Sequence, residues 1–191
     1  MADLTPVGMA VLALLNERPM HAYEMYQLLM SREEDRLLKV RLGTVYHTVE
    51  RLAGQRLVEA TGTGRAGNRP ERTTYAITAA GAAALRRRIG DAIETPVYEY
   101  PLFPVALSEA HNLPADETVR LLNRRIDLLQ LQVDEVEKTI ERVRAEDVEE
   151  AYWFVADYLR TQAVAERDWL QTIVNRMENK DLPWPYRSKN S

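Results

Sequence analysis

Apolar residues near the start of the chain recur every three or four positions. This spacing is typical of amphipathic helices. Thr5 followed by Pro6 is a helix-start signal, and Thr44 is predicted to cap a third helix that stops near Gly54. The three predicted helices cover residues 4–15, 22–29 and 45–52.

The period then changes from helical to alternating. Residues 57–61 and 73–78 are rich in β-branched side chains, and a stretch rich in Gly, Pro and Arg separates them. This pattern predicts a β-hairpin with a long tip. Thr78 then precedes an Ala-rich helix. Three helices, a hairpin and another helix are the order of a winged helix-turn-helix, which we predict over residues 1–90.

A long second helical region follows a proline-rich stretch. Residues 94–104 hold three prolines among aromatic residues and are predicted not to continue a helix, which places a linker at 91–114. We predict a helical, coiled-coil-like dimerisation domain at 115–180 and a mobile tail at 181–191. The predicted fold class is therefore mainly α with a small β-hairpin.

The dimerisation prediction depends on a heptad seam, in which apolar residues alternate at spacings of three and four. A second apolar stripe runs through residues 149–177, and it either folds back on the first helix or packs on another subunit. The seam residues are Val119, Leu122, Ile126, Leu129, Val133, Val136, Ile140 and Val143.

Composition narrows the class of protein. The chain has no cysteine, which excludes disulfides and thiolate metal sites. Its longest apolar run, at 7–15, is too short to span a membrane and lacks a basic leader, so we expect a cytoplasmic protein with no membrane partner. The net charge is −4, but residues 1–90 hold 13 Lys+Arg against 9 Asp+Glu, and residues 91–191 hold 12 against 20. The two halves are therefore expected to do different jobs.

The sequence shows no constellation typical of an enzyme. His21, His47 and His111 lie far apart, and none has a metal-ligand spacing or a neighbouring nucleophile. The carboxylates of residues 134–150 fit the solvated face of a helix. We predict neither catalytic activity, nor a metal, nor a cofactor.

Positive charge concentrates in residues 39–72, which favours a polyanionic partner such as double-stranded DNA. The start of the third helix is expected to face the major groove, and the hairpin tip is expected to act as a wing on phosphates or the minor groove. Each of these groups also has an alternative to DNA contact. Tyr46 packs in the core, His47 is simply exposed to solvent, and the hairpin tip is a solvated loop. Arg86, Arg87 and Arg88 are expected to interact with the carbonyl end of their own helix. The DNA-binding candidates are Lys39, Arg41, Thr44, Tyr46, His47, Thr48, Arg51, Arg65, Asn68, Arg69 and Arg72.

Aromatic residues form a second cluster of candidates. They suit a flat aromatic effector, and ordinary core packing is the alternative. The effector candidates are Tyr98, Tyr100, Tyr152, Trp153, Tyr158 and Trp169.

Three stretches resemble the PadR family of bacterial transcriptional regulators. Residues 12–25 are similar to its leucine run and the start of its second helix, 43–52 to its recognition helix, and 72–81 to its second wing strand. The acidic helical half resembles longer members with a virulence-activator-like C-terminal domain. Ala22 and Arg56 stand where the family has glycine, and a left-handed backbone at Arg56 would cost about 1 kcal/mol.

The resemblance implies a homodimer that binds a pseudo-palindromic operator through its winged domains. It also implies a repressor, and some members respond to aromatic compounds. Three alternatives stay open: a winged-helix protein-interaction module, a MarR-like regulator and an unrecognised enzyme.

Overall fold

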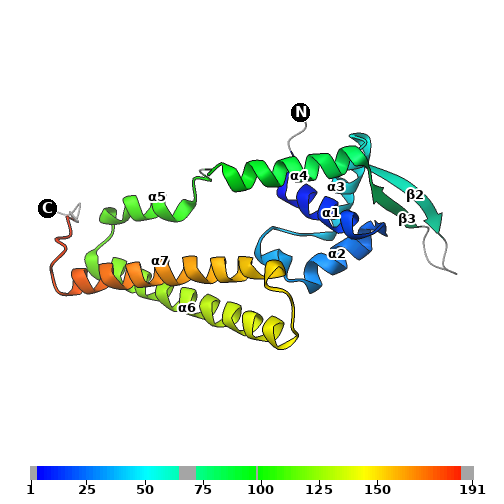
Figure 1. Cartoon of the computed structure of the whole chain (residues 1–191). Helices are drawn as coiled ribbons and strands as arrows, with labels where there is room; N and C mark the ends of the chain where they lie inside the picture. The colour runs from blue at the N-terminus through cyan, green and yellow to red at the C-terminus, as the bar shows by residue number, and fades with distance from the viewer. Residues whose placement is uncertain (1–3, 65–71, 98, 186–191) are drawn as a thin grey trace. The chain divides into compact units, whose positions relative to one another are not determined.

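The computed structural model describes residues 4–64, 72–97 and 99–185 (Figure 1). The chain divides into two compact units, unit 1 (Met1–Glu99) and unit 2 (Tyr100–Ser191). The division between them lies inside the segment predicted as a linker.

Unit 1 is a winged helix-turn-helix, which confirms the predicted fold class. Thr5 caps the first helix by accepting a hydrogen bond from the Gly8 amide (3.2 Å), and Thr78 caps the last by accepting one from the Gly81 amide (3.0 Å). The elements of unit 1 are α1 (Pro6–Glu17), β1 (Met20–His21), α2 (Ala22–Ser31), the short 3-10 helix η1 (Glu34–Arg36), α3 (Leu42–Gly54), β2 (Val58–Gly64), β3 (Arg72–Ile77) and α4 (Ala79–Glu94).

The sheet of unit 1 has three antiparallel strands in the order β1-β3-β2, so the prediction of a hairpin alone was incomplete. Met20 pairs with Tyr75 and His21 with Thr74, next to the hairpin that β2 and β3 form. A strand of two residues is too short to show an alternating pattern, and for this reason the sequence did not predict it. In Figure 1 the β2–β3 hairpin extends away from the helices of unit 1.

The third helix begins earlier than predicted. Its N-cap is Arg41, which makes no side-chain capping bond, and Thr44 lies inside the first turn. The Arg41 carbonyl accepts a hydrogen bond from the Val45 amide (3.1 Å), so the backbone closes the turn without Thr44. The prediction of Thr44 as the cap was therefore wrong.

Unit 2 is helical in its described part. The proline-rich stretch only partly fits the predicted linker, because a helix begins at Leu102 and holds Pro104 in its first turn, where the backbone N–H has no intrahelical partner. The elements are α5 (Leu102–Ser108), η2 (Ala110–Asn112), α6 (Ala115–Ala145), η3 (Glu150–Tyr152) and α7 (Phe154–Glu178).

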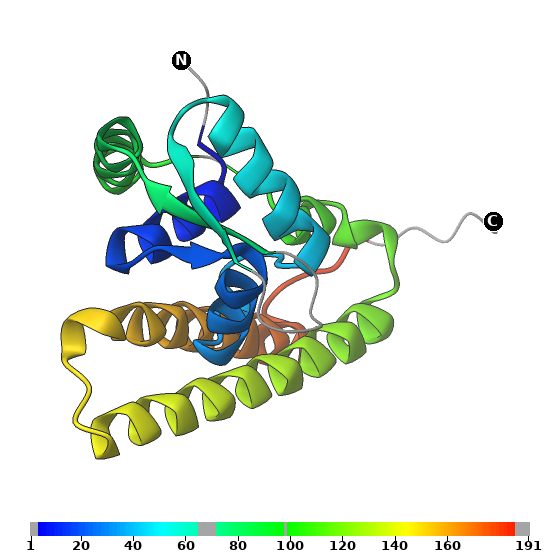
Figure 2. The same cartoon turned by 90° about the vertical axis from the view of Figure 1, so that its right-hand side faces the viewer.

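The long helices α6 and α7 run side by side (Figures 1 and 2), and their contact corrects the predicted role of the heptad seam. Leu129 and Val133 are buried in one cluster with Leu170 and Val174 of α7. Val136 and Ile140 pack with Trp153 at the other end of the seam. The partner helix that the seam requires is thus α7 of the same chain, and the seam is not a free surface for a second subunit.

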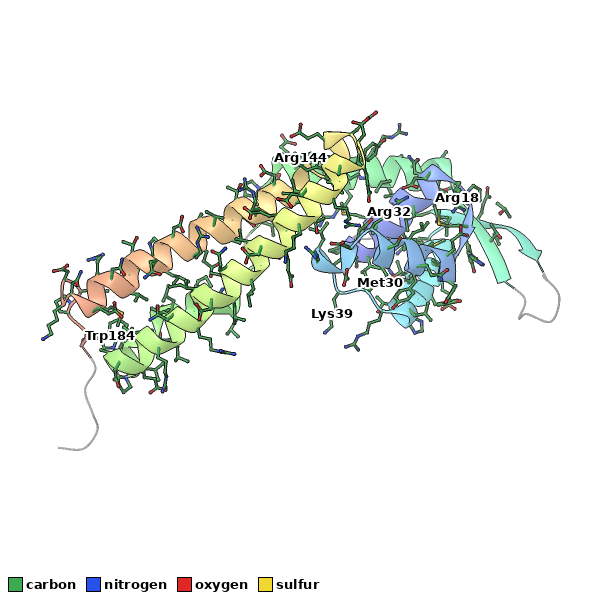
Figure 3. All side chains as sticks on the ribbon, turned by 90° about the horizontal axis from the view of Figure 1, so that it is seen from below. Arg18, Met30, Arg32, Lys39, Arg144 and Trp184 are labelled. Atoms are coloured by element: carbon green, nitrogen blue, oxygen red, sulfur yellow. The ribbon has the colours of Figure 1, made fainter. Side chains whose placement is uncertain are left out.

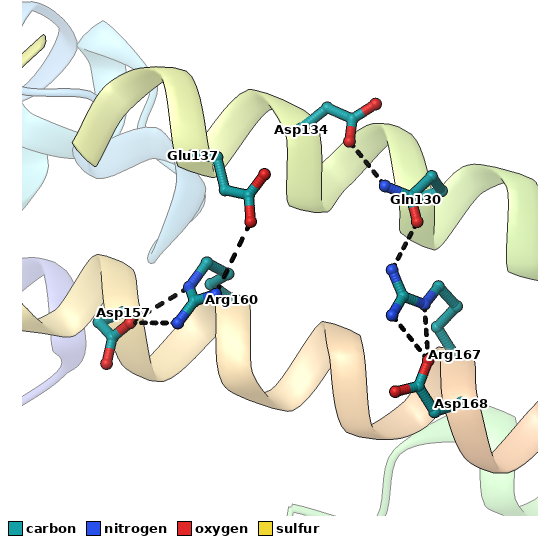
Figure 4. A network of polar contacts seen from close by, with 7 residues as sticks. All are labelled: Gln130, Asp134, Glu137, Asp157, Arg160, Arg167 and Asp168. Carbon is teal, nitrogen blue, oxygen red and sulfur yellow. Dashed lines mark hydrogen bonds and ion pairs between the residues drawn. The ribbon is translucent and has the colours of Figure 1, made fainter. Parts of the chain in front are cut away.

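Polar bridges hold α6 and α7 in register (Figure 4). The Gln130 side-chain oxygen accepts a hydrogen bond from Arg167 (2.5 Å), and Arg160 lies 3.7 Å from Glu137. Outside that figure, Arg125 donates a hydrogen bond to Glu166 (2.6 Å), which explains why a carboxylate interrupts the apolar stripe of α7.

The end of the chain was predicted as a mobile tail from residue 181. Within the described residues, Leu182 and Trp184 instead pack against the cluster between α6 and α7. Trp184, labelled in Figure 3, donates a hydrogen bond from Nε1 to the Leu113 carbonyl (2.8 Å). The prediction is therefore wrong for these residues, and 186–191 lie outside the described residues.

Candidate nucleic-acid interface

The third helix of unit 1 is anchored through one face. Val45, Val49 and Leu52 are fully buried in the core of the unit. Thr48 is also buried, with 6% of its surface exposed, so its predicted place in the groove was wrong. Since residues three and four apart share a helix face, Thr48 lies with Val45 and Leu52.

The opposite face of α3 is exposed and polar. Tyr46 is 43% exposed, and the side chains of His47 and Glu50 are 85% and 70% exposed. The His47 Nδ1 lies 3.6 Å from the Glu50 Oε2. At Gly43 an added Cβ would meet nothing within 4 Å, so the backbone there is open to close approach. This face can present donors, an acceptor and an aromatic ring to a partner.

Glu50 was not among the predicted site residues. It lies three residues after His47 and four after Tyr46, so the helical period places it on the same face. The helical period in the sequence indicates this position, but a carboxylate adds no positive charge and therefore did not fit the criterion for a DNA contact.

The basic candidates divide into three groups. Lys39 and Arg41 are exposed next to the start of α3, and Lys39 is labelled in Figure 3. Arg51 is half-buried and donates a hydrogen bond to the Thr5 hydroxyl (3.1 Å). The wing candidates Arg65, Asn68 and Arg69 lie outside the described residues. Arg72 begins β3, and its side chain lies outside the description.

The arginines near the end of α4 differ from the prediction. Arg88 donates a hydrogen bond to the Leu4 carbonyl (3.2 Å), at the start of the chain rather than at the end of its own helix. Arg86 and Arg87 are exposed.

Both departures from the family pattern have a structural explanation. Ala22 is buried at the start of α2, where a methyl group fits the core. Arg56 has a φ of 59°, so the backbone is left-handed. It follows the end of α3, and the hydrogen bonds from the Arg56 amide to Ala53 and from the Leu57 amide to Leu52 (both 2.9 Å) are those of a Schellman motif. Arg56 therefore occupies the position that favours glycine.

Two ion pairs join the ends of α1 and α2. Arg32 donates two hydrogen bonds to Glu17 (2.5 and 2.8 Å), and they lower the pKa of that carboxyl against the opposing effect of partial burial. Arg18 lowers the pKa of Glu24 in the same way. Burial raises the pKa of the neighbouring Glu34.

The aromatic effector candidates of unit 2 do not share one environment. Trp153 is buried, donates a hydrogen bond to the Val148 carbonyl (3.0 Å) and lies 5.0 Å below the Arg144 guanidinium, so it is a core residue. Tyr100, Tyr152, Tyr158 and Trp169 are exposed, and Tyr98 lies outside the described residues.

No helix among residues 4–64, 72–97 and 99–185 has the length and apolar character needed to cross a membrane. Within the same residues, His, Asp and Glu side chains form no group that could hold a metal ion.

The fold and the exposed face of α3 define a winged-helix protein of the DNA-binding class. Residues 11–87 match the sequence profile of the Transcriptional regulator PadR-like family. This match identifies residues 11–87 as a PadR-like domain and supports a DNA-binding transcriptional regulator. No curated protein sequence matches the chain.

Solved structures of similar fold cover both units. Bacillus subtilis PadR in complex with operator DNA is 15% identical, with a TM-score of 0.75, over 92% of this chain and 99% of that chain. The same protein in complex with p-coumaric acid is 14% identical, with a TM-score of 0.72, over 89% and 97%. The Vibrio cholerae virulence activator AphA is 16% identical, with a TM-score of 0.60, over 91% and 96%.

Proposed function

We propose that the protein is a homodimeric repressor that acts in the cytoplasm and binds a pseudo-palindromic operator through α3 and the wing. The observation that carries this proposal is the division of α3 into a buried apolar face and an exposed polar face. A recognition helix needs this division, because one face anchors it and the other meets base edges. The operator DNA bound by Bacillus subtilis PadR supports the same mode of action.

Each exposed residue has a role that suits its chemistry. Lys39 and Arg41 contact phosphates beside the start of α3, and His47 donates a hydrogen bond to guanine or phosphate. Tyr46 packs on a sugar or a thymine methyl group. Thr44, half-buried in the first turn, reaches the phosphate nearest the helix start.

Glu50 contributes specificity. Its carboxylate repels phosphates, so it belongs opposite a base rather than the backbone. In the major groove the amino group of cytosine is a donor that a glutamate accepts from. We assign Glu50 to a cytosine in the half-site.

The wing supplies sequence-independent binding. Arg65, Asn68 and Arg69 stand in the connection between β2 and β3, and Arg72 begins β3. In this proposal they contact phosphates or a narrow minor groove.

The second subunit covers apolar faces that the α6–α7 pair leaves exposed. On α6, Leu121, Leu128 and Leu131 are exposed on the side away from the seam, and on α7 the same holds for Phe154, Tyr158 and Trp169. Two helices packed along one seam leave these large side chains in water, and pairing with a second copy removes them. These outer faces replace the heptad seam as the proposed contact between subunits.

A small aromatic acid is the proposed effector, by analogy with the p-coumaric acid bound to Bacillus subtilis PadR. Tyr100 and Tyr152 are exposed candidate contacts outside the proposed subunit contact. Tyr158 and Trp169, which the second subunit would cover, would contact an effector held at the subunit junction. Trp153 is not a candidate contact, because its ring packs inside unit 2 and its Nε1 donates a hydrogen bond to the Val148 carbonyl.

Fluorescence anisotropy with the protein's own upstream DNA tests the proposal. The native duplex is compared with a scrambled duplex of equal length at several salt concentrations. A preference of about a thousandfold or more for the native duplex supports an operator-specific regulator. No binding to either duplex even at low salt contradicts it and favours the winged-helix protein-interaction module.

A further inference from the structure

Arg51 has a structural partner that its basic charge does not reveal. Its Nη2 donates a hydrogen bond to the Thr5 hydroxyl oxygen (3.1 Å), which also accepts the Gly8 amide hydrogen bond (3.2 Å). One oxygen therefore caps α1 and accepts a hydrogen bond from the last turn of α3. From the other side, Arg88 of α4 donates to the Leu4 carbonyl (3.2 Å).

The Arg51 side chain lies close to the first turn of α1. Gly8 is buried, and a Cβ there would lie 2.9 Å from the Leu4 Cδ1 and 3.3 Å from the Arg51 Nη2. The Arg51 guanidinium thus lies directly over the Gly8 backbone. Leu4 is itself buried in the core cluster of unit 1.

Apolar contacts also anchor α3. Val45, Val49 and Leu52 pack in the core, and such packing depends on area more than on direction. A hydrogen bond has a defined distance and angle. The Arg51–Thr5 bond is therefore a directional contact between α3 and the start of α1.

We propose that Arg51 is a positioning residue that sets the orientation of α3 through Thr5, and that it is not a phosphate contact. The exposed side chains of Tyr46, His47 and Glu50 then meet the base edges at a fixed angle. This inference rests on the proposed function, because it assigns Arg51 a part in operator specificity.

The first experiment needs no DNA. Amide hydrogen exchange across residues 42–54 is measured in the wild type and in Arg51→Ala, Arg51→Lys and Thr5→Val. Arg51→Ala and Thr5→Val are expected to raise exchange in α3 by about tenfold, since a bond from a charged donor is lost. Thr5→Ser keeps both the cap and the acceptor and is expected to match the wild type. Unchanged exchange in Arg51→Ala overturns the proposal.

The second experiment separates positioning from phosphate binding. Arg51→Ala and Thr5→Val are each expected to reduce the preference for the native over the scrambled duplex by about tenfold, and the double variant to lose no more than either alone. The slope of log affinity against log salt stays that of the wild type. Arg87→Ala, which removes an exposed arginine of α4, is the matched control and is expected to keep the preference.

The opposite pattern contradicts the positioning role. Arg51 is a phosphate contact if Arg51→Ala weakens binding to both duplexes equally and lowers the slope of log affinity against log salt by about one per subunit. If Arg51→Ala does not fold, Arg51→Lys keeps the charge and loses the guanidinium geometry, so it carries the same test. If the wild type shows no preference for the native duplex, the proposed function fails, and hydrogen exchange still decides whether Arg51 orients α3.

Discussion

Helices α3 and α6 are both amphipathic, but their exposed faces differ in chemistry. The outer face of α3 carries Tyr46, His47 and Glu50, whereas the outer face of α6 carries Leu121, Leu128 and Leu131. Polar groups on an anchored helix suit hydrogen bonds to base edges, and exposed leucines suit burial against protein. The exposed face of α3 in unit 1 therefore suits a nucleic acid, and the exposed face of α6 in unit 2 suits another protein surface.

This comparison also explains the charge asymmetry of the chain. Positive charge in the first half accompanies the polar face of α3, and the acidic second half would repel a nucleic acid. A net charge of −4 for the whole chain hides both tendencies.

The largest expected effect separates the two faces of α3. Leu52→Ala removes a fully buried side chain and is expected to lower the free energy of unfolding by about 2–5 kcal/mol. Tyr46→Ala is expected to change it by at most about 0.5 kcal/mol but to weaken operator binding. Urea unfolding and anisotropy of both variants check this contrast. A large loss of stability in Tyr46→Ala would place the ring in the core instead.

The outer face of α6 is tested with a charge. Leu128→Glu is expected to give a monomer in sedimentation and to weaken operator binding by about a hundredfold, because two linked half-site contacts become one. Gln171→Glu places the same charge at an exposed position of α7 outside the apolar faces and is the control. A Leu128→Glu protein that remains a dimer would move the subunit contact elsewhere.

Removing the Glu50 charge is expected to have a smaller effect on DNA binding, which differs between the scrambled and the native duplex. Glu50→Gln is expected to strengthen binding to scrambled DNA by about fivefold, since a charge that repels phosphates is lost. Its preference for the native operator is expected to fall by about tenfold. Selection from randomised duplexes should show a relaxed cytosine at one position of each half-site. If Glu50→Gln strengthens binding to the native and the scrambled duplex equally, Glu50 makes no base contact.

The ends of the two helices offer a comparison in stability. Arg56 after α3 and Asp147 after α6 both have positive φ, at 59° and 55°. Arg56→Gly and Asp147→Gly are each expected to raise the free energy of unfolding by about 1 kcal/mol, because glycine adopts this backbone without strain. Denaturant titration measures the change. A lower stability in either variant would show that the side chain contributes more than the strain costs.

The smallest effect concerns pH. The pKa of Glu17 is lowered in the folded protein, so its ion pair stabilises above the unfolded value of about 4.3. That contribution is lost as the pH falls through the lowered folded pKa. Glu17→Gln should therefore flatten the acid side of the stability curve slightly, because the pair is exposed. An unchanged acid limb would show that the pair adds nothing to stability.

Much of the fold followed from the period of apolar residues. The helices of unit 1, the hairpin and the long pair of unit 2 were all predicted from it. The partner of the seam was not, because a heptad pattern requires a facing helix without specifying whether the same chain supplies it. Strand β1 was missed because Met20 and His21 pair through the backbone.

The candidate site was predicted less completely. Tyr46 and His47 lie on the exposed face as predicted, whereas Thr48 is buried and Glu50 was not among the candidates. Arg51 shows the general limit, because an arginine in the sequence indicates charge but not whether a hydroxyl from a distant helix accepts its hydrogen bond.

The contacts that close unit 1 also set the order in which it can form during synthesis. The Arg88 side chain bonds the Leu4 carbonyl, 84 positions earlier, and β1 finds its neighbour only when Tyr75 is present. A nascent chain emerges from its N-terminal end, so α1 and β1 are synthesised before their partners β3 and α4. The sheet and the Arg88–Leu4 hydrogen bond can therefore form only after those later elements have emerged. A chain whose synthesis stops before residue 88 therefore lacks the hydrogen bond between Arg88 and Leu4.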